Sequence, residues 1–337
     1  MKSSGIGGQA VMEGIMMRNG SEYSVAVRKE NGEIEVKKET YKGVGSKCKL
    51  FRLPFIRGIF SFVDSLVLGM KSLNYSASLF MEDGEEEEEP GRFEKWLQKK
   101  FGDKAEKVIM DLTMVISIIL AMGIFMVFPT WVSTLMKPLL GNGIWMALFE
   151  GVLRIAIFIA YVGLISLMPD IKRTYMYHGA EHKCINCIEH GLPLTVENVM
   201  KSSKEHKRCG TSFMLVVMFV SILLFMFISV PNMWVRMVLR ILLIPVIAGI
   251  SFEFISLAGK SENPVINVLS KPGLWLQALT TREPDDSMLE VAISSVEAVF
   301  DWRDFLAHYE DEEEQPEEEG FEVVDVEDEN DEILQAL

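Results

Sequence analysis

The stretch LTMVISIILAMGIFMVFPTWVSTLM, from Leu112 to Met136, is 25 residues long and carries no charged side chain. A helix of about 20 apolar residues crosses the hydrocarbon core of a bilayer, which is about 30 Å thick. A buried helix of a soluble protein is the alternative for any one such segment. The length of this run favours the membrane, and we predict a transmembrane helix here.

Three further long apolar segments follow. Gly210–Val235 is free of charges, whereas Ile144–Met168 and Met237–Ala258 contain a few. The four segments together predict a mainly α-helical, multi-pass membrane protein with about four transmembrane helices. Met1–Gly20 lacks the apolar core of a secretory signal, so we expect no such signal there.

The Lys and Arg residues near these segments are unevenly distributed. Six lie in Gly91–Asp111 and seven in the link between the second and third segments, but the link between the first two has only Lys137. Cytoplasmic loops of membrane proteins carry the excess of Lys and Arg. The pattern therefore predicts that both termini and the loop 169–211 are cytoplasmic.

The N-terminal part has a β-type pattern. Apolar and polar residues alternate in Tyr23–Val27 and Ile34–Val36, on either side of the turn sequence Asn31-Gly32. We predict a small antiparallel β-hairpin from this pattern. The preceding run Gly7–Gly14 is glycine-rich but lacks the Gly-Lys-Ser/Thr ending of a nucleotide loop, which favours tight backbone packing over a ligand site.

Composition divides the chain into six parts. They are a glycine-rich segment with the hairpin (1–48), an amphipathic helix at the membrane interface (49–80), an acidic linker (81–91), the membrane domain with its His/Cys loop 169–211 (92–260), a cytoplasmic loop and amphipathic helix (261–307), and an acidic tail (308–337). Residues 49–80 carry too many charges for a further span, which favours an interfacial helix over a re-entrant segment.

The C-terminal parts are expected to be cytoplasmic. The prolines in Ser261–Pro284 predict a loop with short turns, whereas Leu289–Ala307 has apolar residues at helical spacing. The net charge of −15 comes from Glu310–Glu332, which alone holds 15 acidic residues. We expect this tail to be disordered, with an interaction tail for a basic partner as the alternative.

Residues that carry chemistry concentrate in the loop 169–211, which holds four of the five histidines and three of the four cysteines. The run His178-Gly-Ala-Glu-His182 reads H-x-x-E-H, the spacing of an inverted zinc-protease motif. On a helix both rings leave from one face. Glu189 lies two turns beyond His182, so we expect it to support the ligands rather than to bind the metal.

Two ligand sets are open. In the first, His178 and His182 bind Zn²⁺ with His206 or Cys209 as third ligand, water completes the site, and Glu181 takes a proton from that water. In the second, Cys184 and Cys187 join His206 and Cys209 in a closed structural zinc site. In a third interpretation these residues only cap helices and bind lipid headgroups.

Glu150, Arg154 and Glu253 are charged residues within the predicted spans. Glu150 and Arg154 are four residues apart, the order favoured by a helical ion pair. Glu253 has Arg240 or Lys260 as candidate partners. Charges at membrane depth face protein or water. A packing or snorkelling role is favoured over a path for substrate or protons.

Four runs resemble the YqhQ-like bacterial family, which is domain-of-unknown-function family 1385. They are GGQAVMEGIMMR (Gly7–Arg18), YHGAEHKCINCIEHG (Tyr177–Gly191), LTVENV (Leu194–Val199) and RCGTSF (Arg208–Phe213). The resemblance covers about Gly5 to Phe300. It implies a multi-pass protein of the bacterial plasma membrane and a metal-dependent enzyme.

The resemblance also bears on the site residues. Those that fall on family motif positions are His178, Glu181, His182, Glu189, Arg208 and Cys209. Cys184 stands where the family is expected to have Thr, and Lys207 where it is expected to have Pro. The pair Cys184–Cys187 would then be peculiar to this chain, which favours the open site with His178 and His182.

Three functions fit these observations. A metal-dependent hydrolase at the membrane face is the first. The second is a non-catalytic membrane factor that binds a cytoplasmic partner, such as the translation or membrane-insertion machinery. The third is a transporter subunit, which would need to form an oligomer. No direct readout of nucleic acid is expected.

Overall fold

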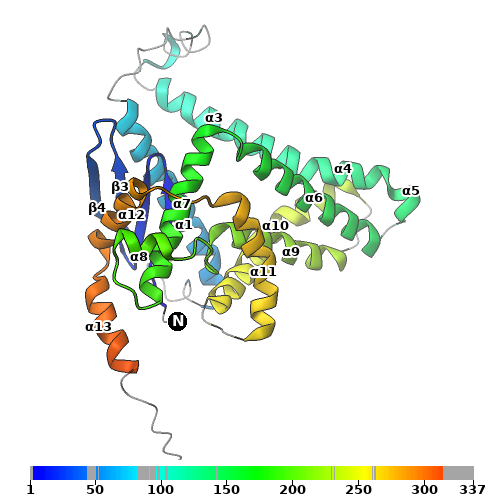
Figure 1. Cartoon of the computed structure of the whole chain (residues 1–337). Coiled ribbons are helices and arrows are strands. Elements are labelled where there is room, and N and C mark those ends of the chain that lie inside the picture. The colour runs from blue at the N-terminus through cyan, green and yellow to red at the C-terminus, as the bar shows by residue number, and fades with distance from the viewer. Residues whose placement is uncertain are drawn as a thin grey trace, which may run out of the picture.

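The computed structural model describes residues 3–43, 51, 53–81, 91, 96, 99–102, 105–141, 143–228, 230, 232–259, 261 and 263–313. A small β-sheet with its covering helices lies at one side, and long apolar helices extend to the other (Figure 1). The acidic linker and the acidic tail fall mainly on 82–90 and 314–337, which lie outside the described residues.

The N-terminal part is a four-stranded antiparallel sheet with strand order β1-β2-β3-β4. Its strands are β1 (Gly7–Val11), β2 (Gly14–Asn19), β3 (Glu22–Arg28) and β4 (Ile34–Thr40). The predicted hairpin is β3–β4 and is confirmed. The glycine-rich run forms a second hairpin, β1–β2, that was not predicted. Side chains have no room there, because a Cβ at Gly14 would lie 2.3 Å from the Ala26 carbonyl oxygen.

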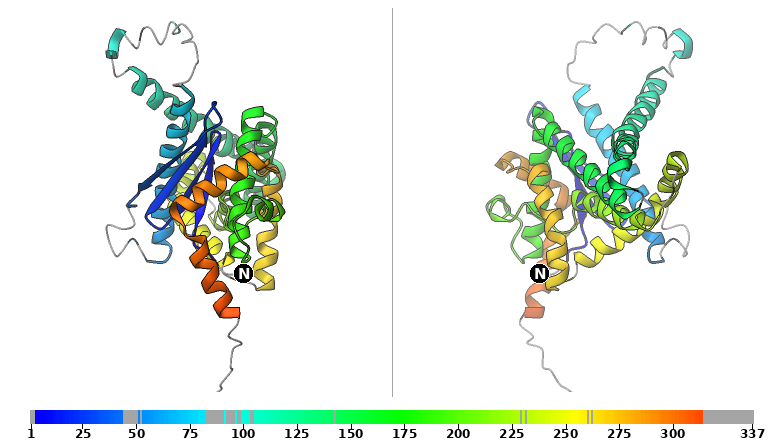
Figure 2. Two further views of the ribbon diagram at one scale, coloured as in Figure 1. Left: turned by 60° about the vertical axis from the view of Figure 1, so that its left-hand side comes forward. Right: turned by 90° about the vertical axis from the view of Figure 1, so that its right-hand side faces the viewer.

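Helices cover both faces of the sheet (Figure 2). Side chains alternate between the faces of a strand. Met16 and Val25 pack with Leu68 of α1 (Ile56–Met81) on one face. Ile15 and Met17 pack on the other face with α7 (Pro169–Glu189) and α12 (Asp286–Val299). Helix α7, which carries the H-x-x-E-H run, is therefore fixed in a core.

Helix α1 occupies the segment predicted to be an interfacial helix. Its sheet-facing side buries Asp64, Leu68 and Ser72. A second stripe on the helix is apolar and exposed, and consists of Val63, Leu66, Val67 and Met70. These positions follow the spacing i, i+3, i+4, i+7 of one helical face.

In the described part of the chain, three helices are long and apolar enough to cross a membrane: Val108–Leu135, Ile144–Ile165 and Trp234–Ala258. The first consists of α3 (Ala105–Met122), the π-helix η4 (Gly123–Val127) and α4 (Phe128–Leu135), followed by the short α5 (Lys137–Leu140); the others are α6 (Ile144–Ile165) and most of α10 (Met233–Ala258).

The segment predicted as the third span is divided. Helix α9 ends at Met226 and has 17 residues, Gly210–Met226. Asn232 then caps α10 by accepting hydrogen bonds from the N–H groups of Trp234 (2.9 Å) and Val235 (3.2 Å). The end of the uncharged run therefore belongs to the next helix.

The C-terminal part contains more helix than predicted. Ser261–Pro284 holds helix α11 (Pro264–Thr280) rather than short turns. Pro264 is tolerated because the first residues of a helix need no intrahelical N–H bond. Leu289–Ala307 is not one helix, since α12 ends before Phe300 and α13 (Trp302–Glu313) follows. Helix α12 packs back on the sheet.

Candidate metal centre

Helix α7 is held against the sheet by the β1–β2 turn. Arg173 donates two hydrogen bonds of 2.5 Å to the carboxylate of Glu13. The Tyr177 hydroxyl donates to the same carboxylate over 3.3 Å. Most of the helix from Tyr177 to Glu189 is buried. The rotation of α7 about its axis is thereby set, and with it the direction of each side chain in the motif.

Gly179 lets another segment cross α7 closely. A Cβ at this position would lie 2.0 Å from the Arg282 carbonyl oxygen. The Arg282 N–H also donates to the Tyr175 carbonyl over 2.9 Å. The glycine of the motif is therefore required by packing, and the crossing segment brings the Thr280 carbonyl beside His178.

Both histidine rings of the motif have one nitrogen paired with the backbone. Nδ1 of His178 lies 2.8 Å from the Thr280 carbonyl oxygen, and Nδ1 of His182 lies 2.7 Å from that of Lys204. A carbonyl only accepts, so each Nδ1 carries the hydrogen and each Nε2 keeps its lone pair. Metal-binding histidines are commonly oriented by such a bond.

Cys209 completes a group of three ligand atoms. Its Sγ lies 3.3 Å from His178 Nε2 and caps α9 by accepting the Thr211 N–H over 3.4 Å. The ligand atoms of His178, His182 and Cys209 all lie within 4.8 Å of one another. Among the described residues, this is the one group of three or more such side chains that could hold a metal ion.

His206 is occupied elsewhere. Its Nε2 lies 3.3 Å from Glu189 Oε2, and its backbone N–H donates to Gln277 Oε1 over 2.9 Å. Glu189 is fully buried, and it also receives hydrogen bonds from Arg208 and from Ser4. Burial raises the pKa of Glu189, but His206 and Arg208 outweigh it and hold that pKa at about 2. Glu189 thus anchors the segment that carries Cys209.

Glu181 is buried between α7 and strand β1. Burial raises its pKa to about 7, against the opposing effects of His178 and of a hydrogen bond from the Gly8 N–H. A Cβ on Gly8 would lie 3.0 Å from the Glu181 carboxyl carbon. The glycine-rich run therefore forms one wall of the site, a role that the sequence pattern alone did not reveal.

Cys184 and Cys187 lie in the core with the sheet and α12. Burial raises the pKa of the Cys184 thiol well above its usual range and that of Cys187 to about 11. The Cys187 thiol points to the carbonyl oxygens of Leu192 and Pro193, at 3.7 and 3.5 Å. The members of the closed ligand set are therefore not brought together.

The three charges singled out in the apolar helices, Glu150, Arg154 and Glu253, have charged partners. Glu150 contacts Arg154 as predicted and also Arg240, which the sequence had offered to Glu253. Glu253 instead binds Arg57 of α1, with hydrogen bonds of 2.7 and 2.5 Å. This pair joins α1 to α10, so its role is helix packing.

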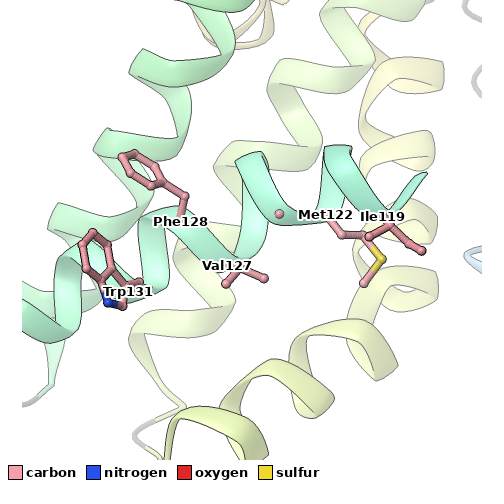
Figure 3. Close-up of a pocket in the computed structure, with 6 residues that line it drawn as sticks. Ile119, Met122, Val127, Phe128 and Trp131 are labelled. Atoms are coloured by element: carbon pink, nitrogen blue, oxygen red, sulfur yellow. The ribbon is translucent and has the colours of Figure 1, made fainter. Parts of the chain in front are cut away.

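A separate hollow of about 480 Å³ on α3, η4 and α4 has no titratable lining (Figure 3). Its lining residues are Ile119, Met122, Gly123, Val127, Phe128 and Trp131. Trp131 and Phe128 are about half exposed. The hollow therefore offers an apolar surface and no reactive group.

Comparison with known proteins identifies the family. The family model described as "Protein of unknown function (DUF1385)" matches residues 53–302. The chain is also similar to the uncharacterized protein YqhQ of Bacillus subtilis (strain 168), with 36% identity over 290 residues that cover 86% of this chain and 90% of the relative. No solved structure matches significantly. The chain belongs to the DUF1385 family.

Proposed function

We propose that this protein is a metal-dependent hydrolase whose site lies at the cytoplasmic face of the bacterial plasma membrane. The observation that carries the proposal is the convergence of His178, His182 and Cys209. Two imidazole nitrogens and one sulfur are ligands that suit Zn²⁺, and three protein ligands leave a fourth position open, as in catalytic zinc sites. When bound, the cation supplies a Lewis acid and lowers the pKa of a coordinated water.

The remaining groups position and move protons. Glu181 lies on the same side of α7 as His178 and His182, at i+3 and i−1, and is the candidate general base. The Gly8 N–H orients its carboxylate. The carbonyls of Thr280 and Lys204 hold the two rings with Nε2 toward the site. This division of roles is that of metal-assisted hydrolysis.

The cytoplasmic placement is part of the proposal. It is supported by three helices long enough to cross a bilayer, with the uncharged 17-residue helix α9 as a fourth, shorter crossing that returns the C-terminus to the side of the N-terminus. The surplus of Lys and Arg in the loop 169–211 supports the cytoplasmic side. A green fluorescent protein fused after residue 337 should fluoresce, and alkaline phosphatase inserted after Lys137 should be active outside the cytoplasm. The reverse pattern would place the site on the outer face and refute this part.

Metal analysis of the purified full-length protein tests the site. We expect about one zinc per chain in the wild type and almost none in His178→Ala or His182→Ala. His190→Ala is the matched control, because His190 is exposed at the end of the same helix and lies outside the ligand group. Full zinc content in all three variants would eliminate the proposed site.

Glu181→Gln separates catalysis from binding. The variant should keep its zinc and fail to complement any growth defect of a strain that lacks the gene. Complementation by a zinc-loaded Glu181→Gln protein would contradict the hydrolase. That outcome would favour a membrane factor that binds a cytoplasmic partner.

A further inference from the structure

A second polar cluster lies at the other end of the apolar helices, where α4, α6 and α10 meet. The Glu150 carboxylate accepts hydrogen bonds from Thr130 (2.7 Å) and Ser133 (3.2 Å). Both terminal nitrogens of Arg240 bind it as well, one of them at 2.9 Å. Glu150 is 2% and Arg240 5% exposed, so the pair is buried.

The cluster contains more positive than negative charge. Arg154 donates to Glu150 over 3.2 Å and to the Phe125 carbonyl of the π-helix over 3.0 Å. Arg236, one turn before Arg240, contacts only uncharged atoms, Thr134 Oγ1 and Met146 Sδ. Guanidinium groups keep their charge at all physiological pH values. Three cations therefore face one carboxylate, and no other acidic side chain of the described residues is paired with them.

Two donors of the cluster have no partner. The Nε atoms of Arg236 and Arg240 are buried and make no hydrogen bond within the described part of the chain. A buried N–H without an acceptor costs free energy comparable to a lost hydrogen bond. The cluster therefore has more hydrogen-bond donors than acceptors, as well as more positive than negative charge.

A cavity of about 160 Å³ lies beside the side chains of Arg236 and Arg240. Its lining includes Glu150, Arg236, Arg240, Ala147 and Phe225. Helices α6 and α10 begin here and α9 ends here, so two positive helix ends and one negative end meet near the cavity. The helix dipoles therefore cancel only in part, and the full charges of the arginines add to the positive potential.

We propose that this cavity binds a phosphate group through Arg236 and Arg240. A tetrahedral oxyanion has several acceptor oxygens, and arginine binds phosphate through the forked N–H donors of its guanidinium group. The group comes either from inorganic phosphate or from the headgroup of an anionic phospholipid. The inference is independent of the metal centre, which lies at the other end of α9.

Binding to the full-length protein in detergent tests the site with two probes. Inorganic phosphate is measured by equilibrium dialysis, and dioleoylphosphatidylglycerol by native mass spectrometry. We expect at least one probe to bind with one molecule per chain. Binding of phosphate alone identifies a soluble ligand, binding of the lipid alone identifies a headgroup, and displacement of the lipid by phosphate shows that both use this cavity.

Two variants decide where a bound probe lies. Arg236→Gln removes a charge that Glu150 does not pair, and it should weaken binding at least about tenfold. Ala147→Leu keeps every charge and fills the cavity, and it should weaken binding by a similar factor. Lys137→Gln is the control, because Lys137 is an exposed cation near the same end of the bundle and is not in the cavity lining.

The proposal fails if neither probe binds. It fails equally if either variant of the cavity binds the probe as the wild type does, or if Lys137→Gln weakens binding as much as Arg236→Gln. Should Arg236→Gln not fold, Ala147→Leu decides alone, since it changes only the space available.

Discussion

The metal centre and the arginine cluster lie at opposite ends of α9, about 25 Å apart along a 17-residue helix. Both are polar clusters buried between helices, but one has unpaired hydrogen-bond acceptors and the other has unpaired donors. At the metal centre, the donor sides of His178 and His182 are used by carbonyls, and acceptor lone pairs remain. At the arginine cluster, the Glu150 carboxylate is bound by Arg240, and the Nε donors of Arg236 and Arg240 have no acceptor within the described part of the chain. This difference in the internal hydrogen bonds is the basis for proposing a cation at one end and an anion at the other.

The largest effect is expected from Glu150→Ala. It leaves Arg240 and Arg154 buried without their carboxylate, and it should lower the free energy of unfolding by about 3–5 kcal/mol. Unfolding in mixed detergent micelles measures this. His182→Ala in zinc-free protein should cost less, because the group it leaves without a partner is the neutral Lys204 carbonyl rather than two buried cations. Equal losses would show that the two clusters do not differ in structural importance.

Zinc should stabilise the protein through the metal centre alone. At a free concentration one hundred times the dissociation constant, a bound ligand adds about 2.7 kcal/mol to the free energy of unfolding. We expect this gain in the wild type and in Arg236→Gln, and none in His178→Ala. Loss of the gain in Arg236→Gln would reveal coupling between the two ends, because distant independent sites have additive effects.

The candidate site was only partly predictable from the sequence. Helical spacing alone places His178 and His182 on one face, because that is a local property. The choice between Cys209 and His206 as third ligand was not local. Glu189 and Gln277, distant in sequence from Cys209, hold His206 away from the ligand group. No pattern in one sequence reports such contacts.

The arginine cluster shows a second limit of the sequence analysis. In the sequence, Arg236 lies just before the predicted span Met237–Ala258 and Arg240 near its start, and only Arg240 was considered, as a partner of Glu253. The structure places both on α10, one turn apart, where they face Glu150 and its cavity. A signal was available, since two arginines four residues apart share a helix face. Using that signal required knowing where α10 begins, and Asn232 marks that start by capping the helix.

The sequence predicted a hairpin only where the turn contains residues that favour a tight turn. Asn31-Gly32 marked the β3–β4 hairpin correctly. The β1–β2 hairpin turns through Met12-Glu13, and Glu13 has a positive φ of 47° that no turn residue announces. Its conformation is held by the contact with Arg173 on α7. Tertiary contacts therefore supply what local propensity does not.

Gly179→Ala should have an intermediate effect that is confined to the metal end. The added Cβ would meet the Arg282 carbonyl oxygen at 2.0 Å, so the crossing segment must move. We expect a loss of about 1–3 kcal/mol in stability and weaker zinc binding, with phosphate binding at the arginine cluster unchanged.

Gly163→Ala is the control for that substitution. A Cβ on Gly163 of α6 has no neighbour within 4 Å, and alanine favours a helix over glycine by up to about 1 kcal/mol. Unchanged zinc affinity in Gly179→Ala would contradict the idea that the crossing segment positions His178.

The smallest change in stability is expected from Glu39→Gln, because Glu39 belongs to a solvent-exposed cluster, unlike the metal centre and the arginine cluster. Hydrogen bonds from Lys71 and Tyr23, each 2.5 Å long, hold the pKa of Glu39 at about 2, below its usual 4.5. Because the pKa is lowered on folding, the stabilisation is present above pH 4.5 and is lost as the pH falls toward 2. Lys71 is 54% exposed, so the gain should stay below about 1 kcal/mol. Wild type and Glu39→Gln should differ slightly in unfolding free energy at pH 7 and converge near pH 2. A difference of several kcal/mol at pH 7 would refute the idea that burial determines how much stability is lost when a charged partner is removed.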